Sequence, residues 1–243
     1  DTLTTLVDHH LVGVTDRSDG PSRFSVLESL RQFARAELDE HGESPLVTGR
    51  LIGWVVGLAE RVRDDITAGH GRDASSPLER DLPALRAALA AAHSIGDPAP
   101  AIRVIAATWP WWPAVGRARE AIAYLDSAVA MVDAGANVAP AYLADALRGR
   151  AELALAVGDA AHAQRFAARS IDMYGELGDE ARLSRSLYTL GWALSTAGEL
   201  EPAEVAHRQQ LDIARRLQLD VDEAQALSGL ARIAFERRDH RTA

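Results

Sequence analysis

The sequence predicts a mainly α-helical chain whose second half is an α-solenoid, a stack of repeated helical pairs. Segments in that half resemble one another at a constant offset along the chain. Two earlier segments, 49–66 and 78–93, carry apolar residues at helical spacing. Strand signals are confined to the first part of the chain, around a turn at Asp19-Gly20. We therefore expect a β-hairpin unit, a helical bundle and a repeat array, in that order.

The repeats are recognised by residues that recur 40 positions apart. These are Leu147, Leu187 and Leu227, then Ala151, Gly191 and Ala231, and then Ala163, Ala203 and Ala243. The small residues of each unit resemble the two small positions of a tetratricopeptide (TPR) repeat, where helix A and helix B approach closely. Gly158 and Gly198 are expected to form the turn between the two helices of a pair. The third unit has Arg238-Asp239 at this place, which is a weaker stop signal.

A divergent unit precedes these three at an offset of 42, with Gly116 and Ala121 in the places of the later turn glycine and small residue. Trp109 then occupies the small position of its helix A. The predicted units of the array, which covers 99–243, are about 101–134, 142–177, 182–217 and a truncated 222–243. A helical linker bundle is predicted over 45–98.

The first 44 residues predict a different unit. Leu11–Thr15 and Arg23–Val26 flank the turn as two short strands, and a helix follows from about Leu27 to Gly42. A hairpin followed by a helix suggests the C-terminal part of a winged-helix domain over 1–44, with the hairpin as its wing. An isolated hairpin that caps the helical array is the alternative.

Several segments, taken in order, resemble the bacterial STAND (NB-ARC-like) ATPase regulators. They are "LTTLVDHHLV", "RFSVLESLRQFARAELDEHGE", "LERDLPALRAALAAA" and "TWPWWPAVGRAREAIAYLDSAVAM". Actinobacterial transcriptional activators of the antibiotic-regulatory (SARP) and large LuxR types carry such an array downstream of their ATPase. The resemblance implies a fragment without the NTPase core, with ATP or ADP bound only in the full-length protein. It also implies the upstream NTPase domain as a partner of this fragment.

The chain departs from that pattern at His10, Asp81 and Ala84. In related plant and animal STAND proteins, a Met-His-Asp triplet follows the wing, and its histidine touches bound ADP. Here Val26, Leu27 and Glu28 stand at those positions, so that Glu28 alone is a candidate for coupling to the nucleotide state.

Composition excludes several function classes. All 26 basic residues are arginine, so neither a Walker A lysine nor Schiff-base chemistry is available. The net charge of −9 argues against direct nucleic-acid contact by this fragment. No apolar run reaches the roughly 18–20 residues of a membrane helix, and a cytoplasmic protein is expected. Without cysteine, an H-E-x-x-H pair or a nucleophile elbow, we expect neither a metal site nor an enzyme.

Two surfaces are candidates for binding a protein partner or a small inducer. In "TWPWWP" (108–113), Trp109 and Trp112 are expected to pack, which leaves Trp111 as the exposed, ligand-facing ring. The second surface is the face of the A helices that lines the groove in TPR arrays. Its predicted residues are Asp145, Arg148, Glu152, Arg185, Tyr188, Trp192, Gln225, Ser228 and Arg232. A solvated helix face is the alternative.

The resemblance favours a regulatory or sensor fragment of a STAND-type transcriptional activator, in which the array couples an NTPase core to partner or inducer binding. A free-standing TPR adaptor for protein–protein interaction is the alternative. A third hypothesis is an accessory segment of a signalling enzyme such as a cyclase.

Overall fold

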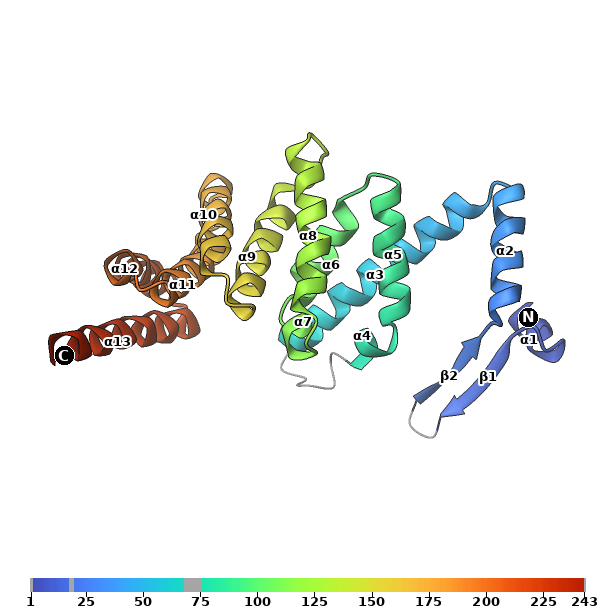
Figure 1. Ribbon diagram of the computed structural model, residues 1–243, viewed down its shortest axis with the longest axis horizontal. Coiled ribbons are helices and arrows are strands. Elements are labelled where there is room, and N and C mark those ends of the chain that lie inside the picture. Colours follow the sequence, from blue (N-terminus) through green and yellow to red (C-terminus); the bar gives the residue numbers. More distant parts are fainter. Residues whose placement is uncertain (1, 18–19, 68–75, 243) are drawn as a thin grey trace. The chain divides into compact units, whose positions relative to one another are not determined.

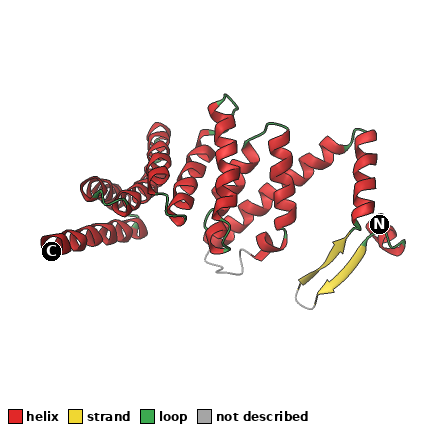
Figure 2. Cartoon of the chain, viewed as in Figure 1, coloured by secondary structure: helices red, strands yellow, loops and turns green. Residues whose placement is uncertain are grey.

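The chain is predominantly helical, as the sequence predicts (Figure 2). A computed structural model describes residues 2–17, 20–67 and 76–242 (Figure 1). Its helices are α1 (Thr2–Asp8), α2 (Glu28–Glu40), α3 (Ser44–Thr67), α4 (Ser76–Arg80), α5 (Leu82–Ser94), α6 (Ala99–Thr108), α7 (Trp111–Ala114), α8 (Ala118–Asp133), α9 (Pro140–Ala156), α10 (Ala160–Leu177), α11 (Glu180–Thr196), α12 (Leu200–Leu217) and α13 (Asp220–Thr242). Its strands are β1 (Gly13–Arg17) and β2 (Gly20–Ser25). The chain divides into two compact units, Asp1–Leu51 and Ile52–Ala243.

The first unit contains the expected hairpin. Strands β1 and β2 pair antiparallel, with Gly13 opposite Ser25 and Val14 opposite Phe24. Asp19 of the predicted turn lies outside the described residues. Helix α2 follows the hairpin, and Gly42 after it has a positive φ of 69°, a backbone conformation that favours glycine. The hairpin and the helix after it are therefore confirmed, whereas the winged-helix assignment stays a prediction.

In the second unit, the part of α3 from Ile52 onward packs through apolar residues that recur at the helical spacing predicted from the sequence. Val55, Leu58 and Val62 are buried. Trp54, an apolar residue of the same predicted segment, is instead 45% exposed. The predicted helix over 78–93 is divided into α4 and α5, because a proline stands in the first turn of α5 and cannot continue the backbone hydrogen bonds of a preceding helix.

The array consists of the helical pairs α6–α8, α9–α10 and α11–α12, followed by α13. The first helices of successive pairs contact one another, so that α6, α9, α11 and α13 form one layer, here called the A helices. Gly116, Gly158 and Gly198 have φ values of 71°, 79° and 80° in the turns that precede α8, α10 and α12. These three turns follow the sequence prediction. Asp159 then caps α10, because its side chain accepts a hydrogen bond from the backbone N–H of His162.

The small residues of the repeats are buried where two helices meet. Ala163 packs against Ala154 and Ala193, and Ala203 packs against Leu194 and Leu200. Neither Ala163 nor Ala203 is exposed to solvent. Because the packing of protein interiors leaves little spare volume, these positions allow the helices of a pair to approach closely.

The expected turn at Arg238-Asp239 is wrong. Helix α13 runs without interruption from Asp220 to Thr242. The earlier turns each contain a glycine with positive φ, and this position has none. Without a residue that adopts the left-handed conformation at low cost, the helix continues.

Candidate ligand-binding groove

The tryptophan segment joins α6 to α8 through the short helix α7. Trp112 is fully buried, and its indole Nε1 donates a hydrogen bond of 3.1 Å to Thr108 Oγ1. The Thr108 hydroxyl in turn donates to the carbonyl oxygen of Val104 at 2.7 Å. This chain of hydrogen bonds satisfies the polar atom of a buried aromatic residue, which explains how Trp112 serves as core.

Trp111 is not the exposed ring that the sequence predicted. Its side chain is 4% exposed, and its ring meets that of Trp112 edge-on, with centroids 4.9 Å apart. The prolines do not make an open corner, because Pro113 lies within α7, and this short helix packs against α8. Both tryptophans of α7 are therefore buried.

Trp109, and not Trp111, is the tryptophan of this segment whose ring faces a cavity. It is half-buried and lines two adjacent cavities. Its side chain lies against Gly149 of α9, and the Arg148 guanidinium carbon lies 5.6 Å from its ring centroid. A glycine within a helix was the available sequence signal, because such a position often marks a close approach.

The first cavity, the aromatic pocket, has a volume of about 380 Å³. Its lining residues are Trp109, Pro110, Pro113, Glu152, Leu155, Ala156, Tyr188 and Trp192. The rings of Tyr188 and Trp192 lie 6.2 Å apart, and the Arg232 guanidinium carbon lies 4.0 Å from the centre of the Trp192 ring. The structure thus brings together four residues predicted for the A-helix face: Glu152, Tyr188, Trp192 and Arg232.

Two polar groups at the aromatic pocket are donors. Burial, and then the charge of Glu152, raises the pKa of the Tyr188 hydroxyl above its ordinary value, so that the hydroxyl stays protonated at neutral pH. The Glu152 carboxylate itself accepts a hydrogen bond of 2.7 Å from Thr189. Arg232 has Nε and Nη2 buried without a hydrogen-bond partner in the described part of the chain. Such unpaired buried donors are uncommon in folded proteins.

The second cavity, the basic pocket, has a volume of about 340 Å³. Its lining residues are Arg63, Ile66, Arg103, Ala106, Ala107, Trp109, Pro110, Tyr142, Asp145, Arg148, Arg182 and Arg185. Five guanidinium groups and one carboxylate therefore line it. Trp109 and Pro110 belong to both cavities, which together are called the A-helix groove from here on.

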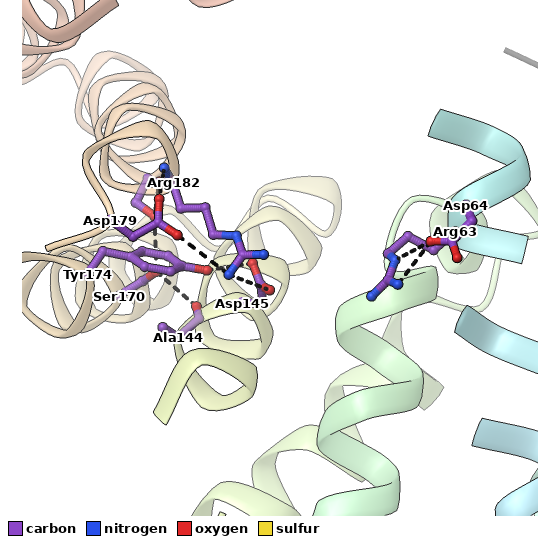
Figure 3. A network of polar contacts seen from close by, with 9 residues as sticks. Arg63, Asp64, Ala144, Asp145, Ser170, Tyr174, Asp179 and Arg182 are labelled. Carbon is purple, nitrogen blue, oxygen red and sulfur yellow. Dashed lines mark hydrogen bonds and ion pairs between the residues drawn. The ribbon is translucent and has the colours of Figure 1, made fainter. Parts of the chain in front are cut away.

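The arginines of the basic pocket differ in their partners. Arg103 donates two hydrogen bonds to Glu60, the shorter of 2.6 Å, and its guanidinium carbon lies 5.1 Å from the centre of the Tyr142 ring. Arg182 lies between Asp179 and Asp145, at 3.6 and 4.0 Å (Figure 3). These longer separations are ion pairs without a hydrogen bond, so that the Arg182 guanidinium keeps its donors free.

Asp145 is held in place from the core side. Tyr174 is fully buried and donates a hydrogen bond of 2.5 Å to the carboxylate of Asp145 (Figure 3). Burial, followed by the hydrogen bond to Asp145 and its charge, raises the pKa of Tyr174. The hydroxyl therefore stays protonated at neutral pH, and its hydrogen bond holds the Asp145 side chain at the edge of the basic pocket.

Other predicted residues lie apart from the groove. Ser228 is exposed and Gln225 is half-buried on α13, and neither lines the two cavities. Glu28 is exposed at the start of α2 in the first unit, where it accepts a hydrogen bond of 2.8 Å from Arg31. Its coupling to a nucleotide state stays a prediction. Sequence reasoning missed Arg63, Arg103, Arg182 and Trp109 as groove residues.

Two searches of the described residues bear on other kinds of site. They contain no group of three or more His, Cys, Asp or Glu side chains that could hold a metal ion. Among the helices that the structure describes, none is both long and apolar enough to cross a membrane.

The chain is 28% identical over 222 residues to proteins of Mycobacterium tuberculosis and Mycobacterium bovis that are provisionally named HTH-type transcriptional regulators. The similarity links this chain to transcriptional regulators. The match covers 89% of this chain and 25% of those proteins, so the chain spans about a quarter of the length of the curated relatives it matches. No family model matches the chain. The crystal structure of BtubC (BKLC) from P. vanneervenii is similar over 81% of this chain and 93% of that one, at 14% identity and a TM-score of 0.49.

Proposed function

We propose that the chain is a regulatory fragment of a STAND-type transcriptional activator. In this proposal the TPR-like array receives a protein partner or a small inducer and couples its binding to an NTPase core upstream. Nucleotide is bound and hydrolysed by that core, and this chain has no catalytic role, contacts no nucleic acid directly and acts in the cytoplasm.

The A-helix groove is the observation that carries the proposal. It places aromatic rings and arginines from several A helices around two adjacent cavities. Arg232, which has two unpaired donors, lies against Trp192, one of those rings. Pockets of this size, with a few convergent polar groups among apolar ones, are typical of ligand-binding sites. The similarity to named transcriptional regulators supports a regulatory rather than a catalytic use of such a groove.

The first unit supplies the second part of the proposal, a surface for the upstream core. It has an apolar cavity of about 670 Å³, lined mainly by residues of α1, of α2 and of the segments just before β1 and just after β2. Leu27 and Phe33 are 69% and 62% exposed, whereas Val12 is the one buried apolar side chain among the described residues of this unit. Exposed apolar surface of this kind marks a site of protein–protein contact.

The test uses the full-length regulator with a reporter for its target promoter. Trp192→Ala removes an exposed ring of the groove, and Trp54→Ala removes a comparably exposed ring outside it, since the two are 39% and 45% exposed. We expect Trp192→Ala to change the induced reporter signal and the rate of NTP hydrolysis, and Trp54→Ala to change neither. Equal behaviour of the two variants would contradict the proposal.

A free-standing TPR adaptor is the alternative, since the same groove would serve it. An adaptor has no NTPase core to regulate. The full-length protein would then show no NTP hydrolysis for Trp192→Ala to change, while the variant would still bind its protein partner more weakly.

A further inference from the structure

We infer that the A-helix groove binds a small organic anion, with its phosphate or carboxylate group in the basic pocket and its ring against Trp109 and the aromatic pocket. This inference rests on the proposed function and deepens it, because it names the chemical class of the inducer. Three observations carry it: the charge of one cavity, the free donors within it, and the aromatic rings next to it.

The basic pocket gathers positive charge in a chain that is negative as a whole. Five arginines and one aspartate line a cavity of about 340 Å³, whereas the net charge of the chain is −9. Arginines from α3, α6, α9 and α11 converge there, although guanidinium groups repel one another. A concave surface on which one sign of charge predominates concentrates ions of the opposite sign.

Three of these arginines keep their donors free. Within the described part of the chain, Arg148 has no carboxylate within 4.0 Å, and the nearest carboxylate to Arg185 is that of Asp222 at 3.9 Å. The Arg182 guanidinium is likewise within ion-pair distance of two carboxylates but forms no hydrogen bond with them. Each guanidinium presents five N–H donors in a planar fork that matches the oxygens of a carboxylate or a phosphate.

The positions of these three arginines suit one anionic group. Arg182 and Arg185 lie three residues apart on α11, so their side chains leave the same face of the helix. Arg148 comes from the neighbouring helix α9 and also lines the cavity. An anion in the pocket would therefore be held from two helices.

The rest of the ligand is indicated by the side chains at the junction of the cavities. Trp109 and Pro110 line both, so a molecule anchored in the basic pocket meets the indole directly. Beyond them lie the rings of Tyr188 and Trp192. Two cavities of about 340 and 380 Å³ fit a small molecule with a flat apolar part.

The experiment measures binding of phenyl phosphate and phenylacetate to the whole chain by isothermal titration calorimetry. Benzyl alcohol carries the same ring without charge, and inorganic phosphate carries charge without the ring. We expect both aromatic anions to bind, benzyl alcohol not to bind, and inorganic phosphate to bind at least about tenfold more weakly than phenyl phosphate.

Arg148→Gln and Arg185→Gln should each weaken phenyl phosphate binding by about tenfold or more, since hydrogen bonds to charged groups are the strong ones. Arg148→Lys should retain part of the affinity, because it keeps the charge but loses the fork. Arg208→Gln, at an exposed arginine of α12 outside the groove, is the matched control. Circular dichroism melts verify that every variant is folded.

Equal affinity for benzyl alcohol, unchanged affinity in both glutamine variants, or no binding of either aromatic anion at millimolar concentration would overturn the inference. The reporter assay separates this result from the proposed function. If Trp192→Ala alters the reporter while both glutamine variants keep their affinity for phenyl phosphate, the function stands and the anion site fails. If the glutamine variants lose the anion, and neither they nor Trp192→Ala alter the reporter, the site stands and the regulatory function fails.

Discussion

The side chain of Trp109 lies directly against the backbone of Gly149 on the neighbouring helix. A β-carbon at Gly149 would lie 3.2 Å from Cβ, Cγ and Cδ1 of Trp109. A side chain at residue 149 would therefore push the indole away from its position at the junction of the two cavities. The contact joins the first two helical pairs at the site where we propose that a ligand binds.

Gly149→Val should destabilise the chain by about 1–3 kcal/mol, because the added carbons overpack the contact with Trp109. Gly53→Val is the control, since Gly53 of α3 has nothing within 4 Å of its added β-carbon. The control should change stability by no more than about 0.5 kcal/mol, the range of helix propensity. Urea unfolding followed by tryptophan fluorescence measures both, and equal midpoints would show that Trp109 moves freely.

The ring of His207 is enclosed between two glycines, which predicts a coupled pair of substitutions. A β-carbon at Gly229 would lie 2.6 Å from His207 Cε1, and one at Gly191 would lie 2.7 Å from the same atom. Gly229→Ala should therefore cost about 1–3 kcal/mol. The double variant, which combines Gly229→Ala with His207→Ala, should have nearly the same unfolding free energy as His207→Ala alone, because the ring that the new methyl group would meet is gone. Additive losses of unfolding free energy in the double-mutant cycle would rule out this packing.

The stability of the chain should fall as the pH drops through the range in which His207 titrates. Burial, the largest cause, and the charge of Arg232 lower the pKa of His207 below its usual 6.5, while a hydrogen bond with Gln210 opposes them. Below about pH 6.5 the unfolded chain then binds the proton more readily than the folded chain, so stability decreases with decreasing pH.

His207→Gln should flatten the decrease in unfolding free energy between pH 7 and pH 5.5. The parent chain, measured in parallel, is the reference. Urea titrations at several pH values give these slopes. A parent slope that persists in His207→Gln would assign the pH dependence to other groups.

Two alanines at the same repeat position should respond differently to enlargement. Ala151 of α9 is fully buried, whereas the corresponding Ala231 of α13 is exposed. Ala151→Leu should cost about 1–3 kcal/mol through overpacking, while Ala231→Leu should change stability by less than about 0.5 kcal/mol. Thermal or urea unfolding of the two variants tests this difference, which would vanish if the repeats were aligned wrongly.

The sequence predicted best what is decided locally. The turns at Gly158 and Gly198 could be located because a left-handed residue between two helical segments has a clear chemical signature. The 40-residue spacing then placed Asp145 and Arg185 at one repeat position, and Arg148 and Tyr188 at another. Three of these residues, Asp145, Arg148 and Arg185, line the basic pocket. The repeat spacing alone was enough to predict these groove residues, because each regular helical pair turns the same face of its A helix toward the groove.

The sequence failed where the contact partner belongs to another helix. The prediction assigned the buried position to Trp109 and the exposed position to Trp111, which is the reverse of the structure. Both residues lie beside Pro110, and only the packing of α7 on α8 decides which ring is buried. Arg63 could not be placed in the groove because it comes from α3, which lies outside the predicted repeats. Arg103 lies 42 residues before Asp145, but it belongs to the divergent first unit, where the groove face was not predicted. The course of α13 was also missed, because Arg238-Asp239 is only a weak stop.

The basic pocket takes its side chains from three successive helical pairs, through Arg103, Arg148 and Arg185. In a solenoid, the small rotation from one pair to the next sets the curvature of the whole stack. An occupant that draws these three helices together would fix two of those rotations at once. The angular change would then add to the position of every later helix, so that the largest displacement would occur toward the C-terminal end of α13.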